Sequence, residues 1–137
     1  FTLVASSMGM ATACATTLAN PTRVAKIAGI IPLISIAWGQ SLFPVSANAA
    51  YPPVYDDATD GPYHSPLVMA ATLPADLPIH LWCGDIDTTA PLSLAQDFIT
   101  ARPQTGLTIM PGQVHGLPAI GFAAAEVIAF VRDATTN

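Results

Sequence analysis

Short apolar runs of the kind that form buried strands recur along this chain of 137 residues, and segments with helical features separate them. The four runs are residues 1–5, 24–31, 77–84 and 106–110. Their continuous apolar character, without alternating polar positions, is typical of strands that are covered on both faces, as in parallel sheets. Strands that alternate with helices along one chain predict an α/β protein with a parallel sheet flanked by helices.

The segments between these runs carry signals for helices. Residues 8–19 are rich in Ala and Thr and end just before Pro21, which cannot continue a helix. Residues 91–101 place apolar side chains at helical spacing and stop before Pro103. We expect a last helix at 122–133. Its expected core side consists of Phe122, Val127, Phe130 and Val131.

Residues 37–72 differ from the rest of the chain in composition and in periodicity. They are rich in Pro and aromatic residues, and neither a period of 2 nor a period of 3.6 persists. A long aperiodic segment inside a compact domain is usually functional, as a lid or a binding loop. We therefore expect a lid or cap at about 37–72. Two alternatives are open for its aromatic side chains: they line a substrate pocket, or they cover the apolar surface of the sheet. The candidates for binding substrate are Trp38, Phe43 and Tyr51.

Composition and charge narrow the possible classes of function. Hydrophobic residues make up 52% of the chain and charged residues 9%, which excludes a disordered chain. The net charge is −5 with four basic residues and no basic stripe, so we expect no nucleic-acid partner. Two cysteines fit neither a disulfide scaffold nor a zinc site, and no metal is expected. The most apolar stretch, 24–38, is interrupted by Lys26 and Pro32 and is too short to span a membrane.

The junction between the first strand and the first helix carries a recognisable motif. Ala5-Ser6-Ser7-Met8-Gly9 matches the nucleophile elbow G-x-S-x-G, with Ala in place of the first Gly. Such a turn lifts a hydroxyl above the end of the sheet, and backbone N–H groups at the helix start can hold a developing oxyanion. Ser7 is the candidate nucleophile and the Met8 N–H the candidate oxyanion donor. Ser6 is the runner-up, and an ordinary helix-capping serine is the alternative.

The ends of the third and fourth expected strands carry further polar side chains. Asp85 and Asp87 follow the third strand, and His115 lies in a Gly-flanked loop after the fourth. Because the carboxyl ends of parallel strands share one edge, these groups are expected to gather there with Ser7. Nucleophilic catalysis needs such a set: a hydroxyl, an imidazole base and a carboxylate that orients the base.

These motifs resemble those of the α/β-hydrolase superfamily, specifically its serine esterases and lipases. The matching motifs are A-S-S-M-G for Ser7, G-D-I-D for Asp87 and G-Q-V-H-G for His115. The family places its acid three residues after the Gly, which favours Asp87 and leaves Asp85 as the alternative. The resemblance implies a serine hydrolase that cleaves small-molecule or lipid-like carboxylic esters through an acyl-enzyme intermediate, without a cofactor.

The resemblance covers essentially the whole chain but only part of the family's fold. In the family, four strands precede the nucleophile strand, and one of their loops supplies a second oxyanion N–H. We therefore expect residues 1–137 to be the C-terminal part of one α/β-hydrolase domain that needs its N-terminal half, in the same or a separate chain. The alternative is a non-catalytic structural or binding component, for example of a virion. The compartment stays open, with secretion or association with an assembly favoured over the cytoplasm.

Overall fold

A computed structural model describes residues 1–42 and 56–133, and its centre is a sheet of four parallel strands. The strands lie in sequence order, each hydrogen-bonded to the next. The parallel α/β architecture expected from the sequence is therefore confirmed. The strands are β1 (Thr2–Ser6), β2 (Lys26–Ile30), β3 (Ile79–Gly84) and β4 (Gly106–Met110).

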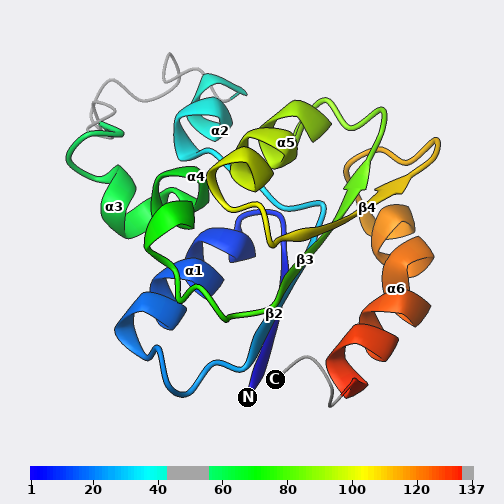
Figure 1. Ribbon diagram of the computed structural model, residues 1–137. Helices are drawn as coiled ribbons and strands as arrows, with labels where there is room; N and C mark the ends of the chain where they lie inside the picture. Colours follow the sequence, from blue (N-terminus) through cyan, green and yellow to red (C-terminus); the bar gives the residue numbers. More distant parts are fainter. Residues whose placement is uncertain (43–55, 134–137) are drawn as a thin grey trace.

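Helices cover both faces of the sheet. Figure 1 shows α6 on one face and α1, α4 and α5 on the other. None of the helices in the described part of the chain is both long and apolar enough to cross a membrane. The helices are α1 (Gly9–Ala19), α2 (Ile36–Leu42), α3 (Gly61–His64), α4 (Pro66–Met69), α5 (Leu92–Ala101) and α6 (Leu117–Arg132), with a 3₁₀ turn η2 at Ala70–Thr72.

A separate apolar core lies on each face of the sheet. Leu81 and Phe98 are fully buried on the side of α1, α4 and α5. Trp82 and Met110 are buried on the side of α6. β2 is buried at every position, because it lies between two strands and under helices on both faces. This double cover explains why the sequence of β2 is continuously apolar rather than alternating. The edge strands β1 and β4 are only partly buried, so the expectation that they are covered on both faces is wrong.

Helix α6 differs from the expectation in its start and in one core residue. It begins at Leu117 rather than at residue 122. Its buried positions are Ala119, Ala123 and Val127, which follow one another at intervals of four residues and so share one helix face. Phe122 is 55% exposed, so its assignment to the core is wrong. Phe122 lies beside the row formed by Ala119, Ala123 and Val127 and is not part of it.

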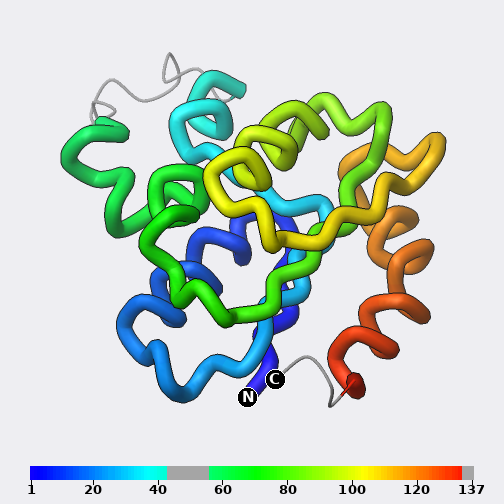
Figure 2. Tube along the Cα trace, viewed as in Figure 1, coloured from blue at the N-terminus to red at the C-terminus, as the bar shows by residue number. Residues whose placement is uncertain are grey.

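The segment 37–72 is more regular than its sequence predicts. Its described parts contain α2, α3, α4 and η2, so the expected absence of regular structure is wrong there. Figure 2 follows the chain as α3 and α4 pass beside α1, and Met69 of α4 is fully buried in the core. Short helices of this kind depend on tertiary packing, because isolated turns are too costly to nucleate alone. The assignment of the segment as a lid stays a prediction, and Phe43 and Tyr51 lie outside the described residues.

The lysine at the start of β2 fastens α6 to the sheet. Lys26 is 2% exposed, and its Nζ donates hydrogen bonds to the carbonyl oxygens of Phe130, at 3.2 Å, and of Asp133. A cation at a helix C-terminus also interacts favourably with the helix dipole. These contacts explain how a charged side chain is tolerated inside an apolar segment.

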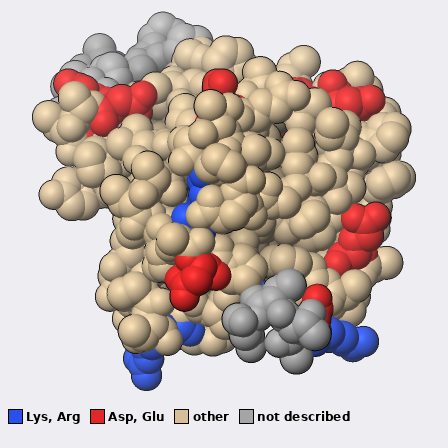
Figure 3. Space-filling view, in the orientation of Figure 1, with Lys and Arg blue, Asp and Glu red and all other residues tan. Residues whose placement is uncertain are grey.

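The outer surface carries few charged groups. In the view of Figure 3, Lys and Arg occupy only small, separate areas, and most of this face is neither acidic nor basic. This view shows no extended basic area of the kind that follows a nucleic-acid backbone. Within residues 1–42 and 56–133, no group of three His, Cys, Asp or Glu side chains is arranged as a metal site.

Candidate active site

The turn between β1 and α1 holds Ser7 in a backbone conformation that is uncommon for a residue with a side chain. Its φ is +49°, in the left-handed region. The Ser7 N–H donates to the carbonyl of Ile30, at 3.2 Å, and the Ser7 carbonyl accepts from the Leu33 N–H, at 3.0 Å. These hydrogen bonds from the end of β2 and the residues after it hold the backbone of the strained turn, and a strained turn of this kind is typical of a nucleophile elbow.

His115 lies in the loop after β4, and its imidazole reaches the Ser7 hydroxyl. The distance between Ser7 Oγ and His115 Nε2 is 2.8 Å. Gly112 (φ +67°) and Gly116 (φ +152°) give the loop backbone angles that residues with side chains rarely adopt. The His115 side chain is 22% exposed. Its ring is therefore open to solvent while it is in contact with the hydroxyl.

The carboxylate in contact with His115 is that of Asp87. His115 Nδ1 lies 2.9 Å from Asp87 Oδ2, and the Asp87 side chain has no exposed surface. The other oxygen, Oδ1, accepts the N–H groups of Thr89 and Ala90, each at 2.8 Å. This network assigns the imidazole proton to Nδ1 and leaves Nε2 able to accept the Ser7 proton.

The two runners-up make other contacts. Asp85 is exposed, and its Oδ1 accepts the N–H of Gly112 at 2.7 Å. Ser6 is the last residue of β1, paired in register with Ile30 of β2. Of the two carboxylates and two serines considered from the sequence, the structure brings Asp87 and Ser7 to the imidazole of His115.

The amide of Met8 follows Ser7 directly, at the start of α1. Met8 precedes the first residue of α1 directly, and its N–H has no acceptor within the described part of the chain. The first N–H groups of a helix point along its axis without intrahelical partners and carry partial positive charge. This amide is therefore free to donate to a negatively charged oxygen next to Ser7.

Trp38 of α2 lies against the loop that holds Asp87. Its indole Nε1 donates to the carbonyl of Thr89 at 3.0 Å, and its side chain is partly exposed. Thr89 in turn donates its N–H to Asp87. This role of Thr89 is not predicted by the sequence analysis. The signal was an Asp followed by Thr-Thr, because Asp side chains readily bond the backbone two residues further on.

The remaining histidines and the cysteines do not join this set of side chains. His80 Nε2 contacts Thr108 Oγ1 at 2.9 Å, and His64 is exposed on α3. Burial, with a smaller contribution from Asp87, raises the pKa of Cys83 to about 12. Burial also raises the pKa of Cys14 to about 12, and Arg102 opposes that shift. Both thiols are therefore protonated at neutral pH and are poor nucleophiles.

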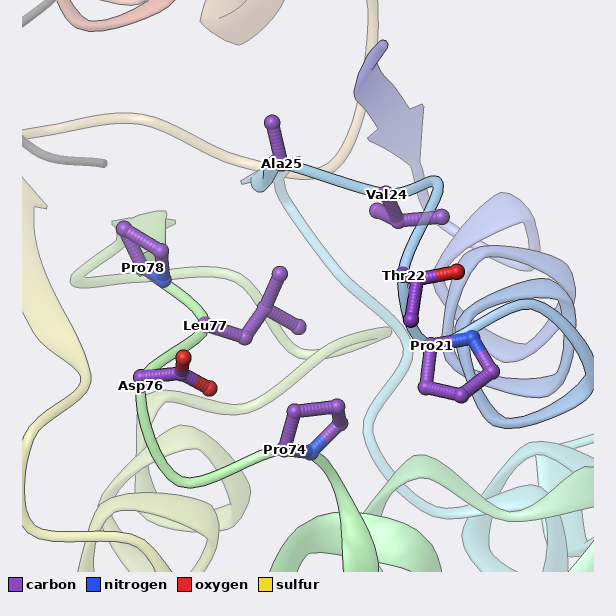
Figure 4. A pocket seen from close by; sticks show the side chains of 8 residues that line it. All are labelled: Pro21, Thr22, Val24, Ala25, Pro74, Asp76, Leu77 and Pro78. Atoms are coloured by element: carbon purple, nitrogen blue, oxygen red, sulfur yellow. The ribbon is translucent and has the colours of Figure 1, made fainter.

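A cavity of about 460 Å³ lies at the opposite end of the sheet. Figure 4 shows it between the segments that lead into β2 and β3. These segments precede the first residues of the strands, whereas Ser7 and His115 follow the last residues of β1 and β4. Among its lining side chains, those of Thr22 and Asp76 are polar. The lining residues are Pro21, Thr22, Val24, Ala25, Pro74, Asp76, Leu77 and Pro78.

Solved structures with the same arrangement of strands and helices identify the fold. A monoacylglycerol lipase from Paleococcus ferrophilus matches 95% of this chain and 67% of its own at 12% identity, with a TM-score of 0.62. An esterase from Pyrococcus furiosus matches 95% and 51% at 17% identity, with a TM-score of 0.62. A thioesterase domain from the curacin biosynthetic pathway matches 96% and 64% at 17% identity, with a TM-score of 0.61. The chain has the α/β-hydrolase fold, as its sequence predicts.

The chain spans only part of the solved chains to which it is similar, for example 48% of a hydrolase from Thermoplasma acidophilum. Neither the family models nor the curated proteins give a sequence match. At these low identities the likeness establishes the fold, and one fold supports many activities. The activity therefore depends on the side chains at the site.

Proposed function

We propose that this chain carries the catalytic residues of a serine hydrolase that cleaves carboxylic esters through an acyl-enzyme intermediate. One observation carries the proposal: the continuous contacts from Ser7 Oγ through the imidazole of His115 to the carboxylate of Asp87, at 2.8 and 2.9 Å. The hydrolases among the structural neighbours, which include an esterase and a lipase, support it.

In the first half of the proposed reaction, Ser7 Oγ attacks the ester carbonyl carbon and its proton passes to His115 Nε2. Asp87 accepts the Nδ1–H and stabilises the imidazolium that forms. The tetrahedral intermediate then collapses, the bond to the alcohol oxygen breaks, and His115 returns the proton to the departing alcohol.

In the second half, a water molecule attacks the acyl group on Ser7. His115 removes a proton from that water, and the bond between Ser7 Oγ and the acyl carbon breaks. The proton returns to Ser7 and the carboxylic acid leaves. Each proton transfer uses groups of this chain, the substrate and water.

The negative charge of each tetrahedral intermediate needs hydrogen-bond donors. The Met8 N–H, at the start of α1, supplies one. We assign the second to the N-terminal half of the fold, the partner expected from the sequence. Removal of a single oxyanion donor typically lowers kcat by about 10²- to 10³-fold, so the proposed activity belongs to the assembled fold.

The free edge of the sheet supports that partnership. Within the described residues β1 pairs with β2 alone, which leaves its other edge available to a further strand. An apolar groove of about 390 Å³ runs beside this edge, between β1 and α6. Its lining includes the exposed side chains of Val4 and Ile128. The chain spans 48% and 51% of the length of two solved neighbours.

The proposed substrate is an uncharged ester with an apolar acyl group, either a small molecule or a lipid. Trp38 presents an aromatic surface beside the Asp87 loop, which suits such a group. Phe43, Tyr51 and the lid at 37–72 remain the predicted remainder of the pocket. The triad alone does not select among ester chain lengths, so substrate preference has to come from this segment.

The test is covalent trapping of the assembled protein, that is, the polypeptide that contains this chain together with the N-terminal half of the fold. A fluorophosphonate should form an adduct on Ser7, located by fragmentation of the tryptic peptide, and nitrophenyl acetate should give a burst of nitrophenol as the acyl-enzyme accumulates. Prior fluorophosphonate treatment should abolish the burst. Absence of both adduct and burst would reject the proposal and favour the non-catalytic structural or binding role.

A further inference from the structure

We propose that Asp85 is a positioning residue for His115, which acts by holding the loop that carries the imidazole; this inference rests on the proposed function. The loop is residues 111–116, called the His loop below. Asp85 Oδ1 accepts the N–H of Gly112 in this loop at 2.7 Å. The Asp85 N–H donates to the carbonyl of Met110, at the end of β4, at 3.3 Å. Asp85 therefore joins the His loop through its side chain and β4 through its backbone.

The residue before Asp85 lies directly against the same loop. A Cβ atom at Gly84 would lie 2.2 Å from the carbonyl oxygen of Gln113, a separation that real Cβ atoms do not show. The contact is with backbone, which cannot swing aside as a flexible side chain can. The end of β3 thus meets the His loop at two successive residues, by close packing at Gly84 and by a hydrogen bond at Asp85.

Apart from the contacts of the His115 ring with Ser7 and Asp87, the His loop has few other restraints. Gly112 and Gly116 both have positive φ, and glycine has the largest backbone freedom to lose on ordering. Val114, between them, is 50% exposed and so anchors the loop weakly. The hydrogen bond from the Gln113 N–H to Met110 is long, at 3.4 Å. A short bond from a backbone N–H to a charged carboxylate is stronger than a neutral one, and here it restrains Gly112.

Asp85 and Asp87 would then have different functions in one loop. Asp87 holds the imidazole itself, through Nδ1. Asp85 holds the backbone three residues before the imidazole. A solvated turn carboxylate would not need a partner on another loop, whereas this bond spans 27 residues of sequence. Because a misplacement of about 1 Å can lower a rate about 10²-fold, restraint of the loop matters to the reaction.

The experiment compares two substitutions of Asp85 with a matched control, in the polypeptide that contains this chain. Asp85→Asn keeps a side-chain oxygen that can accept the Gly112 N–H, and Asp85→Ala removes it. Asp97→Ala, at an exposed position of α5, makes the same change of charge away from the site. We expect Asp85→Ala to lower kcat and the fluorophosphonate labelling rate by roughly 10- to 100-fold with little change in KM. Asp85→Asn should retain most of both, and Asp97→Ala should match the wild type.

A second readout does not depend on turnover. The proton between His115 Nδ1 and Asp87 should give a resolved low-field ¹H NMR signal in the wild type and in Asp85→Asn. In Asp85→Ala this signal should be broadened by exchange with solvent or should disappear. Gly84→Ala, which leaves the Asp85 carboxylate in place, should also weaken the signal by displacing the loop. Thermal melting of each variant establishes that it is folded.

The outcomes separate this inference from the proposed function. If the wild type is labelled at Ser7 and Asp85→Ala is labelled equally fast with its NMR signal intact, the positioning role is overturned and the hydrolase proposal stands. Equal losses in Asp85→Asn and Asp85→Ala also overturn it, because they would reflect charge rather than the hydrogen bond. If the wild type is not labelled, the hydrolase proposal fails, and the NMR signal still decides whether Asp85 holds His115.

Discussion

His115 Nδ1 lies 2.9 Å from Asp87 Oδ2, although 28 residues separate the two in sequence. The contact joins the loops that follow β3 and β4, whose last residues, Gly84 and Met110, pair in register. Parallel pairing therefore brings the two loops out at the same edge of the sheet. The Asp87 carboxylate is shielded from solvent, and its second oxygen is held by backbone N–H groups.

Substitution of Ser7 by Ala should abolish ester hydrolysis above the background rate, because no other hydroxyl contacts His115 Nε2 among the described residues. Ser6→Ala is the matched control, since it removes a neighbouring hydroxyl that belongs to β1. The measurement is the initial rate of nitrophenyl ester hydrolysis. Activity that survives Ser7→Ala but is lost in Ser6→Ala would move the nucleophile to Ser6.

Substitution of Asp87 by Asn should lower kcat by roughly 10²- to 10⁴-fold, because the imidazole loses the carboxylate that orients it and stabilises its cation. Asp85→Asn should have a much smaller effect, because Asp85 bonds Gly112 and not the imidazole. Steady-state kinetics on one ester series measure both variants. The reverse order of effects would assign the acid to Asp85.

Substitution of Trp38 by Ala should change the preference among ester chain lengths, with a shift in discrimination of about 1–3 kcal/mol per methylene of lost contact. Trp38→Phe keeps an aromatic surface but removes the indole N–H that bonds Thr89. It should preserve the chain-length profile more closely than Ala does. The measurement is kcat/KM across nitrophenyl esters of increasing length. An unchanged profile in Trp38→Ala would leave Trp38 a purely structural role.

Substitution of Phe98 by Ala should lower the free energy of unfolding by about 3–5 kcal/mol, because it removes a fully buried side chain of α5 and leaves a cavity in the core. Phe122→Ala should change it by less than about 0.5 kcal/mol, because that ring is largely exposed on α6. Urea denaturation monitored by circular dichroism compares the two. Equal losses would show that Phe122 is covered in the native assembly, for instance by a partner.

The free energy of unfolding should decrease as the pH is lowered, in part because of His80. Burial lowers the pKa of His80 from its ordinary value of 6.5, and Glu126 opposes the shift. As the pH falls through 6.5, the unfolded chain binds the proton first, so the folded state loses stability until the pH passes the folded pKa.

The measurement for His80 is the free energy of unfolding between about pH 8 and pH 5, the range in which histidine titrates. His80→Gln should flatten the dependence, and His64→Gln, at an exposed position, should leave it unchanged. A wild-type curve identical to that of His80→Gln would contradict the assignment.

The class of fold and the main polar groups could be inferred from the sequence because both depend on local signals. The strands are recognised by continuous apolar runs, and the strained turn at Ser7 by the small residues around it. The position of His115 after a strand follows in the same way. The catalytic roles of these residues stay predictions until the kinetic tests are made.

Other features depended on contacts between distant parts of the chain. Residue patterns alone left Asp85 and Asp87 as alternatives, since both follow β3, and only the path of the His loop gives one carboxylate to the imidazole and the other to Gly112. The exposure of Phe122 follows from how α6 is turned on the sheet. Helices α3 and α4 are too short to be favoured by propensity and form against α1. Strand and turn formation were therefore determined by neighbouring residues, whereas side-chain partners were decided by tertiary packing, which joins residues that the local sequence does not relate.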